Sequence, residues 1–239
     1  MSAAGAARAA AVLFAVALAG AACTGPPASS DVPARPMRLA DFAKSDVDQV
    51  AEIHLARTRD HLAELMRKLY RRNPSAWRDA DRPSAEFMVQ RVLRPQRVPD
   101  FLELGGRRDI DAVRLAFEPG YGGDRVLALV AGLASMVDKA YANKREFYLL
   151  DELDPQKLYN CARNIETAAW LLRSRTGSDE RPLILSHSLH DEALNLSFER
   201  LFGMLVSLQD TLALIVAERS NRTIRTVVHR AVGAVFLPI

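Results

Sequence analysis

The densest group of side chains that could bind a metal ion is His187-Ser188-Leu189-His190-Asp191. Two imidazoles three positions apart at the start of a helix could share one ion, with Asp191 supplying a carboxylate oxygen. A di-metal carboxylate bundle needs Glu-x-x-His pairs on separate helices, and the sequence contains no Glu-x-x-His. We therefore expect His187, His190 and Asp191 to cap and flank a helix, with metal binding as the alternative.

A second pair of histidines, His54 and His61, is seven positions apart in the sequence. In a helix both side chains would lie on one face, two turns apart. That spacing could stack two ligands for haem or for a metal ion. Both histidines border a stripe of leucines, where a histidine more often makes a local hydrogen bond at the edge of a core. A ligand- or metal-binding helical domain that uses either histidine pair is the alternative function.

No pattern for nucleophilic catalysis accompanies these histidines. The sequence lacks a Gly-x-Ser-x-Gly motif and a P-loop. Cys161 lies on an apolar helical face, without the helix start or basic neighbours that activate a thiol. We therefore assign no catalytic residue and no cofactor, and we expect the protein not to be an enzyme.

The first 22 residues show the three regions of a secretory signal peptide. Arg8 gives a short positive start, residues 9–18 are apolar, and residues 19–22 are small. The apolar stretch is shorter than the roughly 20 residues that a membrane-spanning helix needs. The segment is therefore predicted to be removed on export.

The segment Ala19-Gly20-Ala21-Ala22-Cys23 resembles the lipobox of bacterial lipoproteins. This resemblance implies cleavage before Cys23 and lipidation of that cysteine with acyl chains such as palmitate. Gly20 stands where the family usually has Leu, so ordinary secretion with cleavage after an Ala-x-Ala site is the alternative. Thr24 directly follows the cysteine, and in this it resembles lipoproteins that are sorted to the outer membrane and face the periplasm. Retention in the inner membrane is the alternative.

Residues 23–40 would form a tether behind the acylated cysteine, because they are rich in proline and serine. Residues 41–239 would form one helical domain, which is long enough to enclose a complete core. The net charge of +3, from 32 basic and 29 acidic residues, is too balanced to predict nucleic-acid binding. The predicted partners are the membrane, through the lipid anchor, and a protein.

Apolar residues recur at helical spacing through most of this domain. Ser45 and Asp48 form a capping pair for a first helix that ends at Arg72. Its apolar stripe is Ala51, Leu55, Thr58, Leu62, Leu65 and Leu69. Further helices are expected over residues 83–93, 107–117, 125–143 and 154–177, and the third of these should be central because it is apolar on nearly every side.

A final long helix is expected to open with Ser188 and Asp191, and either to break at Ser220-Asn221 or to continue. Its stripe is Leu194, Phe198, Leu201, Leu205, Leu208, Leu212 and Ile215. Residues 182–185 are the only candidate strand. The sequence thus predicts an all-α bundle of up-and-down amphipathic helices behind a signal peptide and tether, and a membrane-anchored periplasmic lipoprotein that scaffolds or binds a partner.

Overall fold

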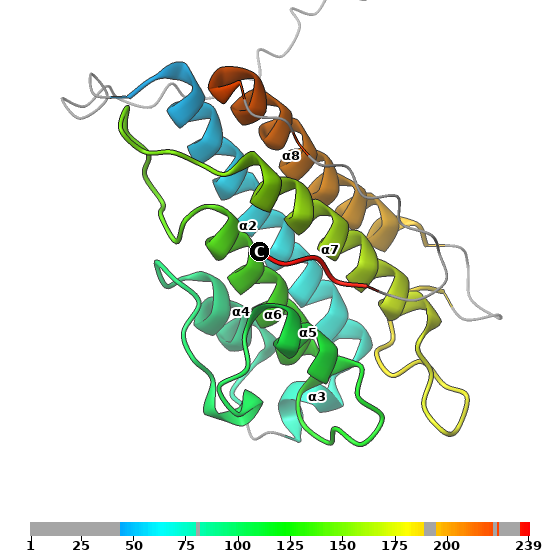
Figure 1. The fold of residues 1–239 in the computed structure, drawn as a ribbon. Helices are drawn as coiled ribbons and strands as arrows, with labels where there is room; N and C mark the ends of the chain where they lie inside the picture. Colours follow the sequence, from blue (N-terminus) through cyan, green and yellow to red (C-terminus); the bar gives the residue numbers. More distant parts are fainter. Residues whose placement is uncertain (1–43, 80–81, 189–194, 222–223, 225–234) are drawn as a thin grey trace, which may run out of the picture. The chain divides into compact units, whose positions relative to one another are not determined.

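Helices form the framework of the protein, as the sequence predicts for an all-α bundle (Figure 1). The computed structural model describes residues 44–79, 82–188, 195–221, 224 and 235–239. These residues belong to the unit Ala40–Ile239, and they contain no strand beyond an isolated antiparallel bridge between Thr176 and Pro182. The predicted signal peptide, the tether, Cys23, His190 and Asp191 lie outside the described residues. The elements are α2 (Asp46–Arg72), α3 (Ser75–Arg78), α4 (Ala85–Leu93), η2 (Leu102–Leu104), α5 (Asp109–Ala116), α6 (Arg125–Ala140), α7 (Pro155–Ser174) and α8 (Ser197–Ser220).

Helix α2 begins and ends where its capping residues predict. The Ser45 hydroxyl accepts a hydrogen bond from the Asp48 backbone N–H (3.3 Å), and the Asp48 carboxylate accepts one from the Ser45 backbone N–H (2.7 Å). This reciprocal pair is a capping box, which satisfies two donors that the first helical turn leaves free. All six residues of the predicted stripe are buried, so the face of α2 that packs on the bundle was predicted from sequence.

Helix α6 is the central helix, as its apolar composition predicts. Fourteen of its sixteen residues are buried. Asp124 caps it by accepting from the backbone N–H of Leu127 (2.8 Å), and the same carboxylate accepts from the Tyr70 hydroxyl (2.7 Å). The start of α6 is thereby held against the end of α2, so these two helices are antiparallel.

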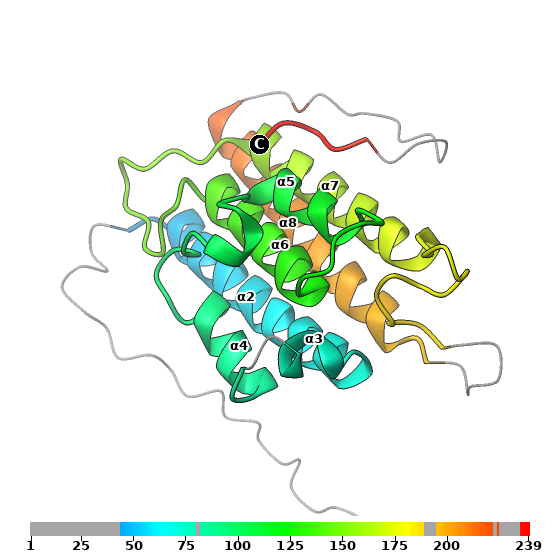
Figure 2. The ribbon, with the colours of Figure 1, turned by 90° about the horizontal axis from the view of Figure 1, so that it is seen from below.

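Four long helices, α2, α6, α7 and α8, pack side by side, with α4 and α5 outside them (Figures 1 and 2). Lys68 near the end of α2 donates to Ser197 at the start of α8, and His54 bonds the Leu208 carbonyl oxygen (3.0 Å). At the other end, Arg219 pairs with Asp48 (3.2 Å). Helices α2 and α8 are therefore antiparallel, and α7 begins at the end of the bundle where α6 ends. This is the up-and-down arrangement that the sequence predicts.

The prediction for the start of α8 is wrong. The helix starts at Ser197, because the Asn195 side chain accepts from the Ser197 backbone N–H (3.0 Å) in a local turn. Ser188 lies nine positions before Ser197 and therefore does not cap α8; its hydroxyl accepts from the Asn195 backbone N–H (2.8 Å). Of the two possibilities left open at Ser220-Asn221, the structure shows the break: α8 ends at Ser220, and Asn221 adopts the left-handed conformation (φ 49°) common at helix ends.

The predicted stripe of α8 is correct at four of the six positions that the structure describes. Phe198, Leu201, Leu205 and Leu212 are buried, whereas Leu208 and Ile215 are only partly covered. The buried face includes Gln209 and Val216 in their place. A helix with 3.6 residues per turn drifts away from a strict 3.5-residue repeat, which accounts for this displacement by one position. Leu194 lies outside the described residues.

A buried carboxylate, Asp138 of α6, holds the segment after α4 against the bundle. Its side chain is 1% exposed and pairs with Arg59 of α2 (3.0 Å) and with Arg145 (2.8 Å). It also accepts a hydrogen bond from the backbone N–H of Val98 (2.9 Å). Two guanidinium groups thus share one buried acid, and removal of that acid would leave both cations without compensation.

Candidate functional site

The histidine pair His54 and His61 lies on α2, and His54 makes a contact between two helices. His54 Nδ1 bonds the carbonyl oxygen of Leu208 (3.0 Å), which links α2 to α8. Both histidines are partly buried at the edge of the core. Among the residues that the structure describes, no group of three or more His, Cys, Asp or Glu side chains is placed to hold a metal ion.

His187 also makes local contacts. Its Nε2 lies 3.2 Å from Glu199 of α8, and its Nδ1 lies 2.7 Å from the Ser186 hydroxyl. Burial lowers the pKa of His187, and the charge of Arg173 lowers it further, against the opposing effect of Glu199. The other two members of the predicted cluster, His190 and Asp191, lie outside the described residues, so their contacts remain a prediction.

Cys161 is a free, fully buried thiol on the inner face of α7. Burial raises its pKa well above the ordinary value, which keeps the sulfur protonated and unreactive. The position agrees with the apolar helical face from which it was predicted. Cys23, the predicted lipidation site, lies outside the described residues.

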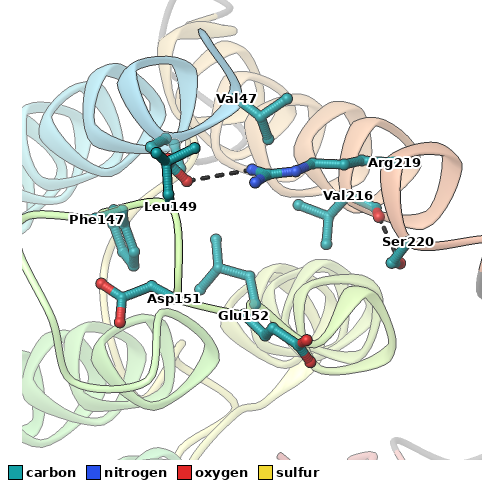
Figure 3. Close-up of a pocket in the computed structure, with 11 residues that line it drawn as sticks. Val47, Phe147, Leu149, Asp151, Glu152, Val216, Arg219 and Ser220 are labelled. Atoms are coloured by element: carbon teal, nitrogen blue, oxygen red, sulfur yellow. Dashed lines mark hydrogen bonds and ion pairs between the residues drawn. The ribbon is translucent and has the colours of Figure 1, made fainter. Parts of the chain in front are cut away.

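A cleft of about 190 Å³ opens at the end of the bundle where α2 begins and α8 ends (Figure 3). Its walls come from the first turns of α2, the last turns of α8, and the connection between α6 and α7. Its apolar lining is Val47, Ala51, Phe147, Leu149, Leu153 and Val216, and its polar lining is Asp48, Asp151, Glu152, Arg219 and Ser220. The cleft thus combines an apolar floor with charged walls.

Two helix ends are joined by an ion pair at one side of this cleft. Arg219 donates to Asp48 (3.2 Å) and to the Ser45 hydroxyl (2.9 Å), as the dashed line to Arg219 in Figure 3 shows for the first contact. Burial alone would raise the pKa of Asp48, but hydrogen bonds from Ser45 and Arg219 outweigh it and hold the pKa below its ordinary value. Asp48 is therefore a carboxylate at neutral pH and is already paired.

The connection between α6 and α7 forms the opposite wall through local hydrogen bonds. Asp151 accepts from the backbone N–H of Tyr148 (3.1 Å) and pairs with Lys144, while Glu52 of α2 accepts from the backbone N–H of Phe147 (2.9 Å). The same connection exposes Leu149 (55%) and Leu150 (96%) beside the cleft. An exposed apolar pair next to a cleft is a feature of recognition surfaces.

The cleft is suited to recognition of a side chain. Pockets for drug-sized ligands measure roughly 300–1,000 Å³, so this cleft is too small for most of them. The hydroxyl of Ser220, which lines it, is hydrogen bonded to the Val216 carbonyl oxygen (2.7 Å). The volume fits one large side chain, and the carboxylates of Asp151 and Glu152 favour a basic head group.

Sequence reasoning found only part of this site. It identified Asp48 as a capping residue, but not its second role as the partner of Arg219. The connection that carries Asp151 and Glu152 has no apolar periodicity, so its position beside the start of α2 depends on tertiary contacts. A signal was present in Leu149-Leu150, two large apolar residues outside any expected helix.

Comparison with known proteins finds no protein-family model, no curated protein and no solved structure that matches the chain. In the described part of the chain, α8 is long and apolar enough to cross a membrane by length and composition. A core helix of a soluble bundle meets the same criteria, and Leu205, Gln209 and Leu212 of α8 are buried among the other helices.

Proposed function

We propose that the chain is a membrane-anchored lipoprotein whose helical bundle binds a protein partner in the cell envelope. The observation that carries the proposal is the lipobox-like segment ending at Cys23, between an apolar signal sequence and a proline-rich stretch. Acylation of Cys23 would hold the domain at the outer membrane, facing the periplasm. Two or three acyl chains make such an anchor effectively permanent.

The cleft at the start of α2 supports the partner-binding part of the proposal. The chain enters the domain at this end, because Ser45 caps α2 directly before the cleft residue Val47. A basic side chain of a partner would lay its aliphatic stem on Phe147 and Val216 and direct its charge to Asp151 or Glu152. The exposed Leu149 and Leu150 would contact the surrounding partner surface.

The anchor is tested by metabolic labelling with a palmitate analogue and by membrane fractionation of two cysteine variants. Cys23→Ser should abolish labelling and should release the domain from the membrane or leave uncut precursor. Cys161→Ser is the matched control, because that thiol is fully buried and should not be acylated. Equal labelling and membrane retention of wild type and Cys23→Ser would remove the basis for the anchor.

The cleft is tested by site-specific photo-crosslinking in intact cells. A photoreactive residue at position 149 should form one discrete crosslinked species, and the additional change Glu152→Lys should abolish it. The control position is 214 on α8, because Leu214 is also exposed (65%, against 55% for Leu149) but does not line the cleft. Crosslinks of equal yield from both positions, or insensitivity to Glu152→Lys, would contradict a partner at the cleft.

A further inference from the structure

The last five residues of the chain, 235–239, form a segment that we call the tail, and it lies against α7 on the side of α5 (Figures 1 and 2). The tail is not helical. It is attached by backbone and side-chain contacts at four successive positions; Val235 (62%) and Pro238 are exposed, and the other three residues are partly buried.

The polar contacts of the tail are made through its main chain. Asn164 of α7 is fully buried, and its amide Nδ2 donates to the Leu237 carbonyl oxygen (2.8 Å) while its Oδ1 accepts from the Leu237 backbone N–H (2.7 Å). One turn earlier on α7, Asn160 donates to the carbonyl oxygen of Pro238 (2.8 Å). A paired donor and acceptor on one amide side chain reproduces the hydrogen bonds that a neighbouring strand would offer.

A supporting residue fixes the orientation of this amide pair. Gln156 Nε2 donates to Asn160 Oδ1 (2.9 Å), which leaves the Asn160 amide N–H₂ directed at the tail. Gln156, Asn160 and Asn164 are spaced four residues apart, so they form one polar row along α7. Asn160 and Asn164 of this row contact backbone atoms of the tail. The side chains of Phe236 and Ile239 are bound by other groups.

Apolar side chains of the tail supply the second half of the contact. Phe236 and Ile239 are partly buried against the hydrophobic core. The guanidinium group of Arg114 on α5 lies 5.6 Å from the centre of the Phe236 ring, within the range of a cation–π interaction. The surface between α5 and α7 therefore holds an aromatic residue, then a residue whose N–H and C=O bond to Asn164, and an apolar residue two positions later.

We propose that this surface is a peptide-binding site, with the tail as an intramolecular ligand that an apolar segment of a protein partner displaces. Two buried asparagines on an inner helix face add little to a core, because their amides need hydrogen-bond partners. They are well suited to hold a peptide backbone of variable sequence. The partner segment is expected to carry an aromatic residue followed by a residue other than proline. This proposal depends neither on the lipid anchor nor on the cleft at the start of α2.

The tail should compete strongly, because it is joined to the bundle. Thirteen residues separate Asn221, at the end of α8, from Val235. A short connection of this kind gives an effective concentration in the millimolar range. If the tail occupies the site in about nine of ten molecules, a separate peptide binds about tenfold more weakly than its intrinsic affinity.

The probe is a synthetic peptide of the tail sequence, Val-Phe-Leu-Pro-Ile, with a fluorescent label at its N-terminus, and the measurement is fluorescence anisotropy with the full chain. Leu237→Pro removes the N–H that donates to Asn164 and leaves every residue of the site unchanged. This variant should bind the probe at least about tenfold more tightly than wild type. Val235→Ser, a change at an exposed position, should bind it as wild type does.

Two further comparisons identify the contacts. Adding Asn164→Leu to the Leu237→Pro variant should abolish binding, and a probe with proline in place of leucine should not bind. The proposal is overturned if Leu237→Pro gains no affinity or if both probes bind equally. If Leu237→Pro loses its helical circular dichroism, the test is made on the wild-type chain. Excess probe must then shift the NMR signals of the Asn164 side-chain amide. Unchanged signals would also overturn the proposal.

Discussion

Replacing Gly132 by alanine should destabilise the protein, although alanine is the better helix former. Gly132 is in the buried α6 and lies directly against α5. A Cβ at this position would lie 2.7 Å from Cγ2 of Val113, 2.8 Å from its backbone nitrogen and 2.8 Å from the Asp109 carbonyl oxygen. Non-bonded carbon atoms prefer separations of about 3.5–4.0 Å. Two of the three neighbours are main-chain atoms, so relief requires movement of α5 itself.

The magnitude follows from two opposing effects. Forcing an extra methyl group into a packed core costs about 1–3 kcal/mol, and a contact with main chain belongs to the upper half of that range. Alanine recovers about 1 kcal/mol through its helix propensity. We therefore expect Gly132→Ala to lower the free energy of unfolding by about 1–2 kcal/mol.

Gly203→Ala is the matched control for this prediction. Gly203 is also inside a helix, α8, but a Cβ there would meet nothing within 4 Å. This variant should gain about 0.5–1 kcal/mol from helix propensity alone. Urea denaturation of both variants, followed by circular dichroism, measures the difference. Stabilisation of both variants to the same extent would refute the close packing of α5 on α6.

Three further predictions concern the core, the buried charge and the pH dependence. Leu205→Ala, at a fully buried position, should cost about 2–5 kcal/mol, whereas Leu214→Ala, at an exposed position of the same helix, should cost less than about 0.5 kcal/mol in the same denaturation assay. Asp138→Asn should cost about 3–5 kcal/mol because two partly buried arginines lose their buried counter-charge, whereas Glu86→Gln, which breaks an exposed ion pair, should cost less than about 1 kcal/mol; similar losses would contradict the burial of Asp138. Because burial lowers the pKa of His187 below its unfolded value of 6.5, the unfolded chain binds more protons there, and stability should fall as the pH drops through and below 6.5. His187→Gln should reduce this fall between pH 7 and 5.5, and identical pH profiles would contradict it.

The helices with strong local signals were predicted from the sequence. The Ser45–Asp48 capping box and the leucine stripe fixed α2, and apolar residues on nearly every side marked α6 as central. The expected helices over residues 83–93 and 107–117 are present as α4 and α5, which both begin two residues later, and α5 ends one residue earlier. Local capping and apolar periodicity determine where such helices form, so contacts with the rest of the structure are not needed to predict them.

Features that depend on contacts between distant residues could not be predicted in the same way. The start of α8 depends on a turn at Asn195, and its buried face follows the geometry of a straight helix packed on α2 and α7. The cleft requires Arg219 to reach the capping box of α2, 171 residues earlier in the chain. Asn160 and Asn164 did carry a signal, because polar residues on the apolar face of α7 conflict with the helical pattern. Their role in binding the tail depends on contacts with residues more than 70 positions later in the chain.

The proposal of a lipid-anchored protein is tested most directly by the intact mass and N-terminal fragment spectrum of the mature protein purified from membranes. The proposal predicts a chain that begins at Cys23 and carries the added mass of a diacylglycerol group, with or without a further acyl chain on its amine. A mature chain that begins after another alanine, or one that begins at Cys23 with an unmodified thiol, would contradict it.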